Sequence, residues 1–503
     1  MTTRIFALFP HDLYSDIKLI RDDKVYLIEH PKFFDRTNYG DMRLNILKPI
    51  YHRLTMICYF EYLKKKNIDV TYVKYDEDWQ RIIKNAIKTR HLCLYDPVDR
   101  DIEADIDELG NYDIYETPRF IMSTQDLIDY DEIKTSDRQT SFYAWCRGRT
   151  DILMKNSKPI GGKLTYDSEN RESPYSGMAD DAAKSSSKFG SKYEKSRNES
   201  NVKEAVKYVV NNIDENSLTI WNATYDDIIS ANYDLDDLDI ELRFPYTHSG
   251  AKKQLSQFVK DKLDNFGKYQ DAMLFEAQDR SLLYHSGLSV MMNVGLITPQ
   301  EIVDEVLKKQ RTVAINNVEG FIRQVLGWRE FARYTYEYNL IPNGNYFQAR
   351  KKISDFWYGG TESKIEPIDI VVSKAWRFGY LHHIERLMIV ANHMMLSRVR
   401  PTDVYRWFTE FSLDSYDWVM EYNVYVMATF SAGPGFTTKP YISSSNYVIK
   451  MSDYTKGDSK DWADDWDILF WQFMKDHASK IKKIPRLSML LKHAESNLKK
   501  LGV

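Results

Sequence analysis

Two adjacent histidines, His382 and His383, stand among aromatic and apolar residues in the stretch GYLHHIERLM, residues 379–388. An imidazole can bind a metal, exchange a proton near neutral pH or hydrogen-bond a flat ligand. Zinc ligands on one face of a helix lie four residues apart, whereas Arg386 and Leu387 stand four residues after these histidines. The spacing therefore argues against a metal site and leaves proton exchange, ligand contact or packing.

Arg386 follows in the same predicted helix, and a guanidinium buried among apolar side chains requires a carboxylate or a ligand as its partner. The next predicted helix carries acids and aromatic residues at spacings of four, four, three and four: Asp403, Trp407, Phe411, Asp414 and Trp418. We predict that Arg386 pairs with Asp414 beside aromatic rings, which would anchor a ring system with hydrogen-bonding edges. A buried ion pair with a purely structural role is the alternative.

A third candidate is YHSGLSVMMNVG at residues 284–295, which places Ser286, Gly287 and Ser289 at the start of a predicted helix. Hydroxyls and backbone N–H groups in that position favour phosphate. Serine is also an ordinary helix cap, so the pattern alone does not decide between the two. The Gly-rich SAGPGFTT at residues 431–438 has no helix signal after it and is predicted to be a loop.

Composition sets the class of protein. The 503 residues are 43% hydrophobic and 28% charged, which is typical of a soluble globular chain with two or three domains. The net charge of -4 gives no overall attraction to nucleic acid, so any polyanion must meet a local basic surface. The lysine-rich residues 475–503 would provide one, although a solvated terminal helix explains them equally well.

The three cysteines, Cys58, Cys93 and Cys146, lie in the first third of the chain and show no metal-ligand spacing. They fit an intracellular, reducing location, in the cytoplasm or the nucleus. No apolar run is long enough to span a membrane and no signal peptide is recognisable. We therefore expect a soluble protein that is not secreted and has no membrane partner.

Residues 1–135 alternate short apolar runs with amphipathic stretches at 41–66 and 78–89, which are predicted helices. The predicted strands are RIFALFP (4–10), KVYLIEH (24–30), VTYVKY (70–75) and HLCLYD (91–96). Strand–helix alternation predicts an α/β domain with a parallel, Rossmann-like sheet. Because no Gly-rich phosphate loop follows the first strand, a dinucleotide site of the usual kind is not expected there.

A linker is predicted over residues 136–202, with a flexible part rich in Ser and Lys at 172–201. Residues 203–503 then read as helical almost throughout, forming a large all-α domain. One helix start is well marked, because Thr298 precedes Pro299 and Glu301 stands three residues after the threonine, as in a capping box.

Six segments resemble the photolyase/cryptochrome superfamily. They are FGKYQDAM (266–273), YHSGLSVMMNVGLITP (284–299), VEGFIRQVLGWREFAR (318–333), HHIERLM (382–388), SYDWVM (415–420) and KPYISSSNYVIKMSDY (439–454). More narrowly, the chain resembles the bacterial photolyase-related branch that carries an iron–sulfur cluster and repairs (6-4) photoproducts. The resemblance covers most of residues 140–500 in order, whereas residues 1–135 agree mainly in architecture.

The resemblance implies a monomer that holds FAD in its helical domain and acts on UV-damaged DNA. In such enzymes a photoexcited, reduced flavin donates an electron to a pyrimidine lesion flipped out of the duplex. Residues 285–289 would hold the diphosphate, and Arg386 and Asp414 would lie beside the flavin ring. The implied cofactor-binding residues are His285, Ser286, Gly287, Leu288, Ser289, Gln324, Arg329, Arg386, Asp414 and Met420.

On the lesion side, the resemblance implies two histidines that donate a proton or a hydrogen bond, two aromatic contacts and two acids. These residues are His382, His383, Tyr441, Tyr447, Asp271 and Asp167. Trp407 and Trp357 match stations that pass electrons from the surface to the flavin. The tyrosine expected after the first of these tryptophans is Phe408 here, which is a poorer redox relay.

The chain departs from the branch at the four cluster cysteines. Ile365, Thr455 and Asp458 stand at three of their positions, and SKDWADDWD has no cysteine for the fourth. Because iron–sulfur clusters require thiolates, no cluster is expected. We predict that Trp462 and Trp466 fill the vacated space by packing.

A second departure lies six residues past Asp414, where the family places a polar side chain opposite flavin N5 and this chain has Met420. A thioether neither donates nor usefully accepts a proton, so altered flavin redox behaviour is predicted.

Three functions follow from these patterns. A light-driven (6-4) photolyase is favoured by the lesion-side histidines and tyrosines. A cryptochrome-like blue-light photoreceptor, or a degenerate flavoprotein without repair activity, is favoured by Phe408, Met420 and the lost cysteines. The branch often holds a ribityl-lumazine antenna between its domains, but the N-terminal motifs are too divergent to assign residues to such a chromophore.

Overall fold

The computed structural model describes residues 4–503 except 179, 183–191, 239, 276–281, 343, 438, 456 and 458–459. Its N-terminal part contains a five-stranded sheet of order β4-β2-β1-β5-β6, in which every neighbouring pair is parallel. The strands are β1 (Arg4–Leu8), β2 (Lys24–Ile28), β4 (Val70–Val73), β5 (His91–Tyr95) and β6 (Tyr112–Tyr115). The predicted α/β fold and its four predicted strands are confirmed.

The central strands are recognisable in the sequence because helices cover both faces of a parallel sheet, so the strands are apolar throughout. In β1, Ile5, Phe6 and Leu8 are fully buried. Strand β6 was not predicted. It is an edge strand, and its sequence YDIY mixes polar residues with Ile114, whose side chain is exposed. Edge strands carry fewer apolar residues because no neighbouring strand covers their outer edge.

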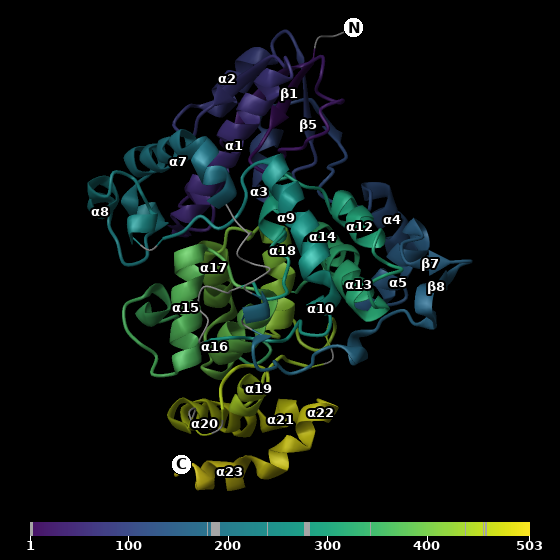
Figure 1. Ribbon diagram of the computed structural model, residues 1–503, viewed down its shortest axis with the longest axis vertical. Coiled ribbons are helices and arrows are strands. Elements are labelled where there is room, and N and C mark those ends of the chain that lie inside the picture. Colours follow the sequence, from purple (N-terminus) through teal and green to yellow (C-terminus); the bar gives the residue numbers. More distant parts are fainter. Residues whose placement is uncertain are drawn as a thin grey trace.

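Helices α1 (Leu47–Lys65), α2 (Trp79–Ala86), α3 (Arg100–Asp107) and α4 (Thr124–Ile133) accompany the sheet. The predicted linker region contains α5 (Gln139–Thr150) and the hairpin of β7 (Met154–Lys155) and β8 (Lys158–Pro159). Of its Ser- and Lys-rich part, residues 179 and 183–191 lie outside the described residues. Residues 192–201 form the first half of α7 (Lys192–Asn212), which lies beside α1 (Figure 1).

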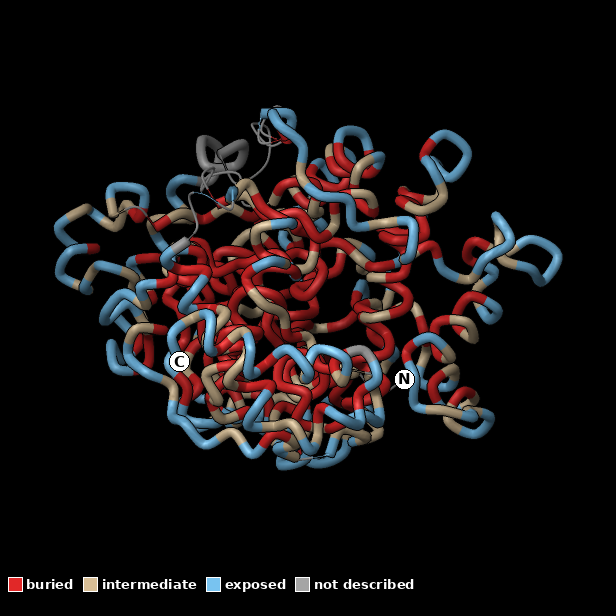
Figure 2. Tube along the Cα trace, turned by 90° about the horizontal axis from the view of Figure 1, so that it is seen from below, coloured by how far each residue is buried: buried red, intermediate tan, exposed pale blue. Residues whose placement is uncertain are grey.

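The remainder is helical apart from the short strand β9 (Leu218–Thr219), which pairs in parallel with β3 (Leu44–Asn45) and was not predicted. Most of this helical part lies below the sheet in Figure 1, with the last helices at the far end. Its main helices are α9 (His248–Asp261), α10 (Leu263–Phe266), α11 (Ser289–Asn293), α12 (Pro299–Leu307), α13 (Ile315–Ile322), α14 (Glu330–Glu337), α15 (Glu366–Phe378), α16 (Asn392–Leu396), α17 (Pro401–Phe411), α18 (Asp417–Glu421), α19 (Ser445–Lys450), α20 (Lys460–Asp476) and α23 (Ala494–Lys500). The predicted capping box of α12 is confirmed, because Thr298 and Glu301 bond each other's backbone N–H groups. Figure 2 shows the buried residues gathered at the centre of the molecule.

Three segments of the helical region are π-helical: Arg323–Arg329, Glu385–Ala391 and Tyr422–Ala428. A π-helical turn inserts a residue into the regular helical spacing and often occurs at functional sites. All three segments contribute residues to the same cavity, described below.

Buried polar contacts join the sheet region to the helical region around residues 414–417. Asp417 accepts from Arg36 at 3.1 Å and pairs with Lys32 at 2.6 Å. Lys48 Nζ donates to the backbone oxygen of Ser415 at 2.7 Å. These contacts matter for function because they hold the chain directly after Asp414. Among the described residues, no helix combines the length and the apolarity needed to span a membrane.

Candidate functional site

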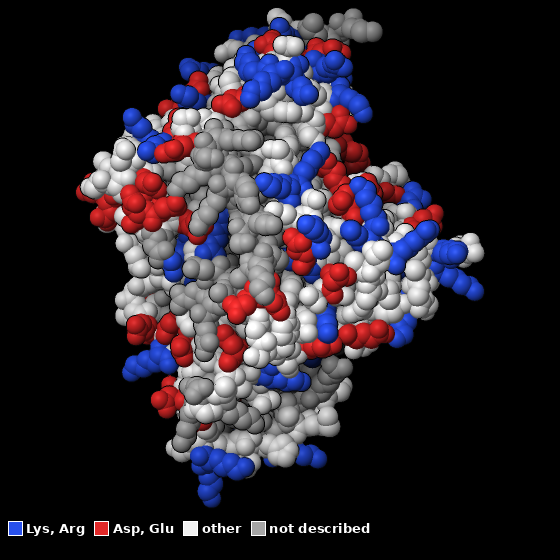
Figure 3. Space-filling view, in the orientation of Figure 1, with Lys and Arg blue, Asp and Glu red and all other residues white. Residues whose placement is uncertain are grey.

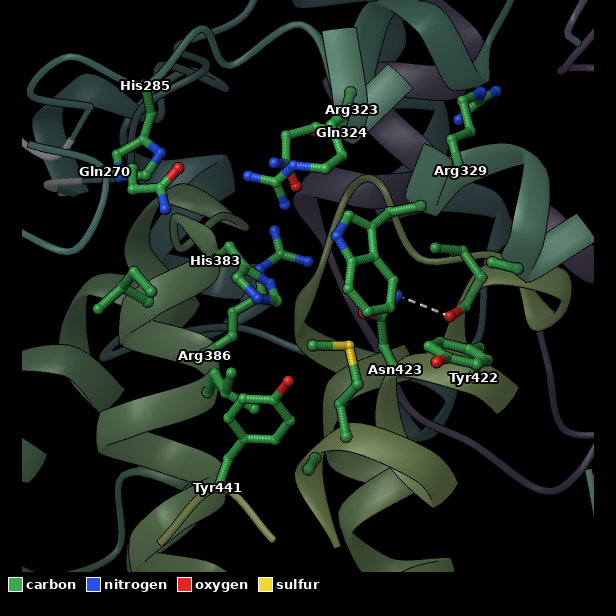
Figure 4. A pocket seen from close by; sticks show the side chains of 18 of the residues that line it. Gln270, His285, Arg323, Gln324, Arg329, His383, Arg386, Tyr422, Asn423 and Tyr441 are labelled. Carbon is green, nitrogen blue, oxygen red and sulfur yellow. Dashed lines mark hydrogen bonds between the residues drawn. The ribbon is translucent and has the colours of Figure 1, made fainter. Parts of the chain in front are cut away.

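A cavity of about 750 Å³ lies within the helical region. Figure 4 shows side chains from several elements pointing into it, among them His285, Gln324, His383, Arg386 and Tyr441. Most of the predicted site residues line it: Asp167, Asp271, His285, Ser286, Leu288, Ser289, Gln324, Arg329, His383, Arg386, Asp414, Met420, Tyr441 and Tyr447. Four predicted site residues are not part of this lining: Gly287, Trp357, His382 and Trp407.

The predicted ion pair is confirmed, because Arg386 Nη1 lies 2.9 Å from Asp414 Oδ1. Ser289 Oγ donates to Asp414 Oδ2 at 2.6 Å, and Ser412 Oγ donates to Asp414 Oδ1 at 2.5 Å. Burial would raise the pKa of Asp414, but Arg386 and the two hydroxyls outweigh it and hold this pKa below its usual value. Asp414 is therefore a carboxylate at neutral pH, and the guanidinium beside it keeps a fixed direction.

The stripe that led to this pairing does not exist as one helix. Helix α17 ends at Phe411, Asp414 lies in the following turn, and Trp418 belongs to α18. Asp403 turns away from the cavity and accepts from Arg400 and from the backbone N–H of Ile353. The turn after Phe411, and not helical periodicity, brings the Asp414 carboxylate to Arg386.

Arg329 is linked to the turn that contains Asp414 through the side-chain amide of Asn293. Its Nη1 donates to Asn293 Oδ1 at 2.5 Å, and Asn293 Nδ2 donates to the backbone oxygen of Asp414 at 2.8 Å. The Arg329 guanidinium also lies 4.7 Å from the ring of Trp418, within cation–π range. Asn293 was missed in the sequence, because a single asparagine in an apolar stretch carries no distinctive spacing.

The two adjacent histidines have different surroundings. His383 lines the cavity, whereas His382 lies behind the wall with its ring stacked on that of His285, 4.3 Å between centroids and 12° between planes. Desolvation lowers the pKa of His285 and His382, and the surrounding protein and Arg386 bring that of His383 to about 4, although the His383 ring is exposed to the cavity. All three rings are therefore neutral at pH 7, and His383 is the one that can touch a ligand in the cavity.

Acidic and basic side chains alternate along one side of the cavity. Asp167 accepts from Arg323 at 2.9 Å and from Arg171 at 2.6 Å, and Arg171 lies 3.5 Å from Asp271. Tyr447 Oη donates to Asp271 Oδ2 at 2.9 Å. The chain of contacts brings Asp167 and Asp271 together, as the sequence analysis expects of residues in one pocket. Arg171 and Arg323 were missed, because neither stands in a spacing that separates it from other surface arginines.

The segment that carries Tyr441 and Tyr447 is held from behind. Asn392 Nδ2 donates to Ser443 Oγ at 3.0 Å, and Trp466 Nε1 donates to the Ser443 backbone oxygen at 3.1 Å. Asp467 accepts from the backbone N–H of Ser445 at 2.8 Å. Helix α20 thus positions the two tyrosines at the cavity wall.

Trp462 and Trp466 are both buried, as predicted, with exposed fractions of 4% and 0%. The substitutes at two of the cluster-cysteine positions are Ile365, which is buried at the start of α15, and Thr455, which is exposed. Asp458 lies outside the described residues. Packing and hydrogen bonds of tryptophans therefore support the region around Ser443.

Phe408 lines the cavity, and Trp407 lies behind it with 5.3 Å between ring centroids. Trp357 lies further out, 5.6 Å from Trp407. Gly287 has a φ of +61°, and a side chain there would press on Gln254, whose Nε2 donates to the Ser286 backbone oxygen. Gly287 and Trp407 thus lie directly behind the wall and Trp357 lies further out, and the roles given to these residues stay predictions.

The buried neutral histidines predict a loss of stability in acid. His393 is packed between Trp357 and Trp466, and burial lowers its pKa to about 4. Between that value and 6.5 only the unfolded chain takes up the proton, so lowering the pH from 7 to 5 costs about 2 kcal/mol of unfolding free energy at this residue. His393→Phe should reduce the acid loss by that amount, measured by urea denaturation at both pH values. The same change at exposed His493 is the control, and equal losses in His393→Phe and the parent would contradict the prediction.

Comparisons with known proteins agree with this architecture. A family model described as deoxyribodipyrimidine photo-lyase-related protein matches residues 6–214. The (6-4) photolyase of Agrobacterium fabrum is 29% identical over 426 residues, which cover 81% of this chain and 77% of that protein. The chain is thus similar to photolyase-related proteins over most of its length.

Solved structures of the photolyase/cryptochrome superfamily share the fold. A bacterial class III photolyase from Agrobacterium tumefaciens superposes over 100% of this chain and 92% of its own, with a TM-score of 0.55 and 14% identity. A cryptochrome from Synechocystis superposes over 100% of this chain and 94% of its own, with a TM-score of 0.56 and 14% identity. The parallel sheet followed by a helical region is thus the photolyase/cryptochrome arrangement.

Proposed function

We propose that this chain is a light-driven flavoprotein that repairs (6-4) photoproducts in UV-damaged DNA. The observation that carries the proposal is the composition of one cavity wall. The Arg386–Asp414 pair, neutral His383 and the two tyrosines Tyr441 and Tyr447 all border the same 750 Å³ space. A site for a flavin alone would not require His383, Tyr441 and Tyr447 at its wall.

The cavity residues fit FAD. Asp414 orients Arg386, whose Nε donates to the Leu381 backbone oxygen, so the guanidinium is held against movement. His285 Nε2 is buried and has no hydrogen-bond partner within the described part of the chain, which is what a ligand atom would supply. Ser286, Leu288 and Ser289 would hold the diphosphate, and Gln324, Arg329 and Met420 would complete the flavin side. When bound, FAD would supply the light-driven electron for the repair.

The lesion would bind against His383, Tyr441 and Tyr447. A neutral imidazole donates at one ring nitrogen and accepts at the other, so His383 can hydrogen-bond the photoproduct and relay a proton to it by accepting one at its second nitrogen. Tyr447 is held by Asp271, and burial raises the pKa of both groups. Arg171 and Arg323 at the same wall would pair with phosphate at the cost of their contacts to Asp167.

Figure 3 shows acidic and basic side chains intermingled over one face of the molecule, with lysine and arginine at the end formed by the C-terminal helices. This distribution fits DNA that is held mainly around the cavity. The role of residues 475–503, the monomeric state and a ribityl-lumazine antenna stay predictions.

The experiment that tests the proposal starts from purified protein with its flavin absorbance recorded. Illumination with oligonucleotides containing a (6-4) photoproduct or a cyclobutane dimer should restore only the first. A protein without flavin would support a degenerate descendant. Bound flavin with no repair of either lesion would support a cryptochrome-like photoreceptor, and repair of cyclobutane dimers alone would overturn the proposed lesion.

The photoreceptor alternative is favoured by Met420, which is buried at the cavity wall where the family has a polar side chain. Met420→Asn should change the rate at which reduced flavin reoxidises in air by about tenfold, because an amide can hydrogen-bond the ring and a thioether cannot. Met420→Leu is the control of similar volume and should keep the wild-type rate. If both variants reoxidise at the wild-type rate, Met420 does not tune the flavin.

A further inference from the structure

Neither of the two tryptophans predicted as electron-transfer stations reaches the surface. Trp357 is 1% exposed, and Trp407 is fully buried. Within the described residues, the aromatic rings in contact with Trp357 are Phe356, His393 and Trp407. Phenylalanine and a neutral imidazole are poor electron donors compared with indole and phenol. An electron that leaves Trp407 for the cavity must therefore be replaced by another route.

A second branch leads away from Trp407. Its ring lies 6.3 Å from that of Trp376, and the ring of Trp376 lies 5.6 Å from that of Tyr358. The two indole N–H groups of Trp376 and Trp407 donate to the same acceptor, the backbone oxygen of Trp357, at 2.7 and 2.8 Å. That carbonyl belongs to the peptide bond that joins Trp357 to Tyr358. The contact fixes the three rings relative to one another.

Tyr358 reaches solvent and has a proton acceptor. It is partly exposed and, together with Glu410, Arg43 and Arg406, lines a separate groove of about 780 Å³. Its hydroxyl donates to Glu410 Oε2 at 2.7 Å. The other carboxylate oxygen, Oε1, accepts from the Arg43 backbone N–H at 2.9 Å and from Arg406 Nε at 2.8 Å. Glu410 is thus held with one oxygen directed at the phenol.

The protonation states of Tyr358 and Glu410 favour proton transfer from the phenol to the carboxylate. Burial and the neighbouring Glu410 raise the pKa of Tyr358, so the phenol keeps its proton at rest. Burial also raises the pKa of Glu410, although its hydrogen bonds with Arg43, Tyr358 and Arg406 oppose the rise. A phenol becomes a strong acid when it loses an electron, and a carboxylate already at hydrogen-bond distance can take the proton without rearrangement.

We propose that Tyr358 is the terminal electron donor of this chain and that Glu410 accepts its proton. This inference rests on the proposed flavin function. With a photoexcited oxidised flavin in the cavity as the electron acceptor, Trp407 would give up one electron, Trp376 would return one to Trp407, and Tyr358 would return one to Trp376. The O–H proton of Tyr358 moves to Glu410 and leaves a neutral tyrosyl radical facing the groove. A thiol reductant from solvent would then restore Tyr358 by donating a hydrogen atom and becoming a thiyl radical, and Glu410 would release its proton to the groove.

An alternative exit runs from Trp357 through His393 to Trp466 and Trp462, with 5.7, 5.9 and 6.3 Å between successive ring centroids. Its second member is an imidazole whose pKa is lowered by burial, and Trp462 is itself buried. The Tyr358 branch avoids the imidazole and ends at a groove. Tryptophan-to-phenylalanine variants of the two branches therefore distinguish them.

The test is photoreduction of the flavin-loaded protein in the presence of a thiol, followed by flavin absorbance and by electron paramagnetic resonance. Tyr358→Phe should lower the photoreduction rate by about tenfold and remove the tyrosyl signal. Trp376→Phe should do the same, whereas Trp466→Phe should keep both the rate and the signal. Glu410→Gln should lower the rate, since the amide cannot take the proton.

Two outcomes distinguish failure of the proposed function from failure of this inference alone. Wild-type protein that binds no flavin would overturn the proposed function and this inference with it. Flavin-loaded Tyr358→Phe that photoreduces at the wild-type rate would overturn only the inference, and a slow Trp466→Phe beside it would assign the exit to the other branch. Unchanged flavin absorbance and circular dichroism in Tyr358→Phe, which keeps the aromatic ring, show that the variant is folded.

Discussion

Replacing Arg386 with leucine is expected to abolish flavin binding and to destabilise the fold. The change removes the cation that lies 2.9 Å from buried Asp414 and, among the described residues, leaves the hydroxyls of Ser289 and Ser412 to hold the carboxylate. Leaving one partner of a buried pair uncompensated costs about 3 kcal/mol of unfolding free energy. The affinity for flavin should fall by about a hundredfold or more, since the guanidinium is also a ligand contact.

The double variant Arg386→Leu with Asp414→Leu separates the two effects. Replacing both members of a buried ion pair by apolar residues is often neutral for stability, so the unfolding free energy should return to within about 1 kcal/mol of wild type. Flavin binding should remain lost, because no polar anchor is restored. Calorimetry or urea denaturation gives the first quantity, and titration of the apoprotein with FAD gives the second.

Arg398→Leu is the matched control, because Arg398 forms a more exposed ion pair with Asp476 away from the cavity lining. A pair of that kind contributes at most about 1 kcal/mol, and flavin affinity should not change. The assignment of Arg386 and Asp414 to the flavin would be wrong if Arg386→Leu bound FAD as tightly as Arg398→Leu does.

His383→Ala is expected to lower (6-4) repair by about a thousandfold while flavin stays bound, because positioned proton transfer contributes on that scale. The ring lines the cavity, and its low pKa keeps it neutral, so it acts as a hydrogen-bond donor and proton carrier and not as a fixed charge. Single-turnover repair of a defined lesion under saturating light measures the effect, with the flavin spectrum recorded on the same sample.

The neighbouring residue provides the control. His382→Phe keeps an aromatic ring stacked on His285 but removes the ring nitrogens, and His382 does not line the cavity. Repair by this variant should stay within about threefold of wild type, a change of less than about 1 kcal/mol in the barrier. A larger loss in His382→Phe than in His383→Ala would reverse the roles given to the two histidines.

The secondary-structure elements that were predicted correctly are those in which the local residue pattern agrees with burial in the structure. The central parallel strands are apolar because both of their faces are covered, and the start of α12 is marked by Thr298, Pro299 and Glu301. The edge strand β6 was not predicted, because a strand that is exposed on one side does not need to be apolar throughout. The first half of α7 was not predicted because its polar composition resembles a linker.

The pairing of Arg386 with Asp414 was predicted by an argument that was partly wrong. Helical spacing placed both acids on one stripe, yet α17 ends at Phe411 and only Asp414 reaches the arginine. The requirement that a buried guanidinium find a carboxylate was the sound part of the argument. It holds whatever local path the backbone takes.

By itself, the sequence determined the α/β and helical regions, the lack of cysteine after residue 146, and the residue types from which a flavin and lesion site would be built. These depend on composition and short-range pattern. Only the tertiary structure decided that His383 faces the cavity while His382 stacks behind it, that Trp357 is sealed from solvent, and that Tyr358 meets Glu410. Adjacent residues can face opposite sides of a cavity wall, and residues far apart in sequence can share a hydrogen bond. Tertiary packing, and not sequence spacing, sets the direction in which each side chain points.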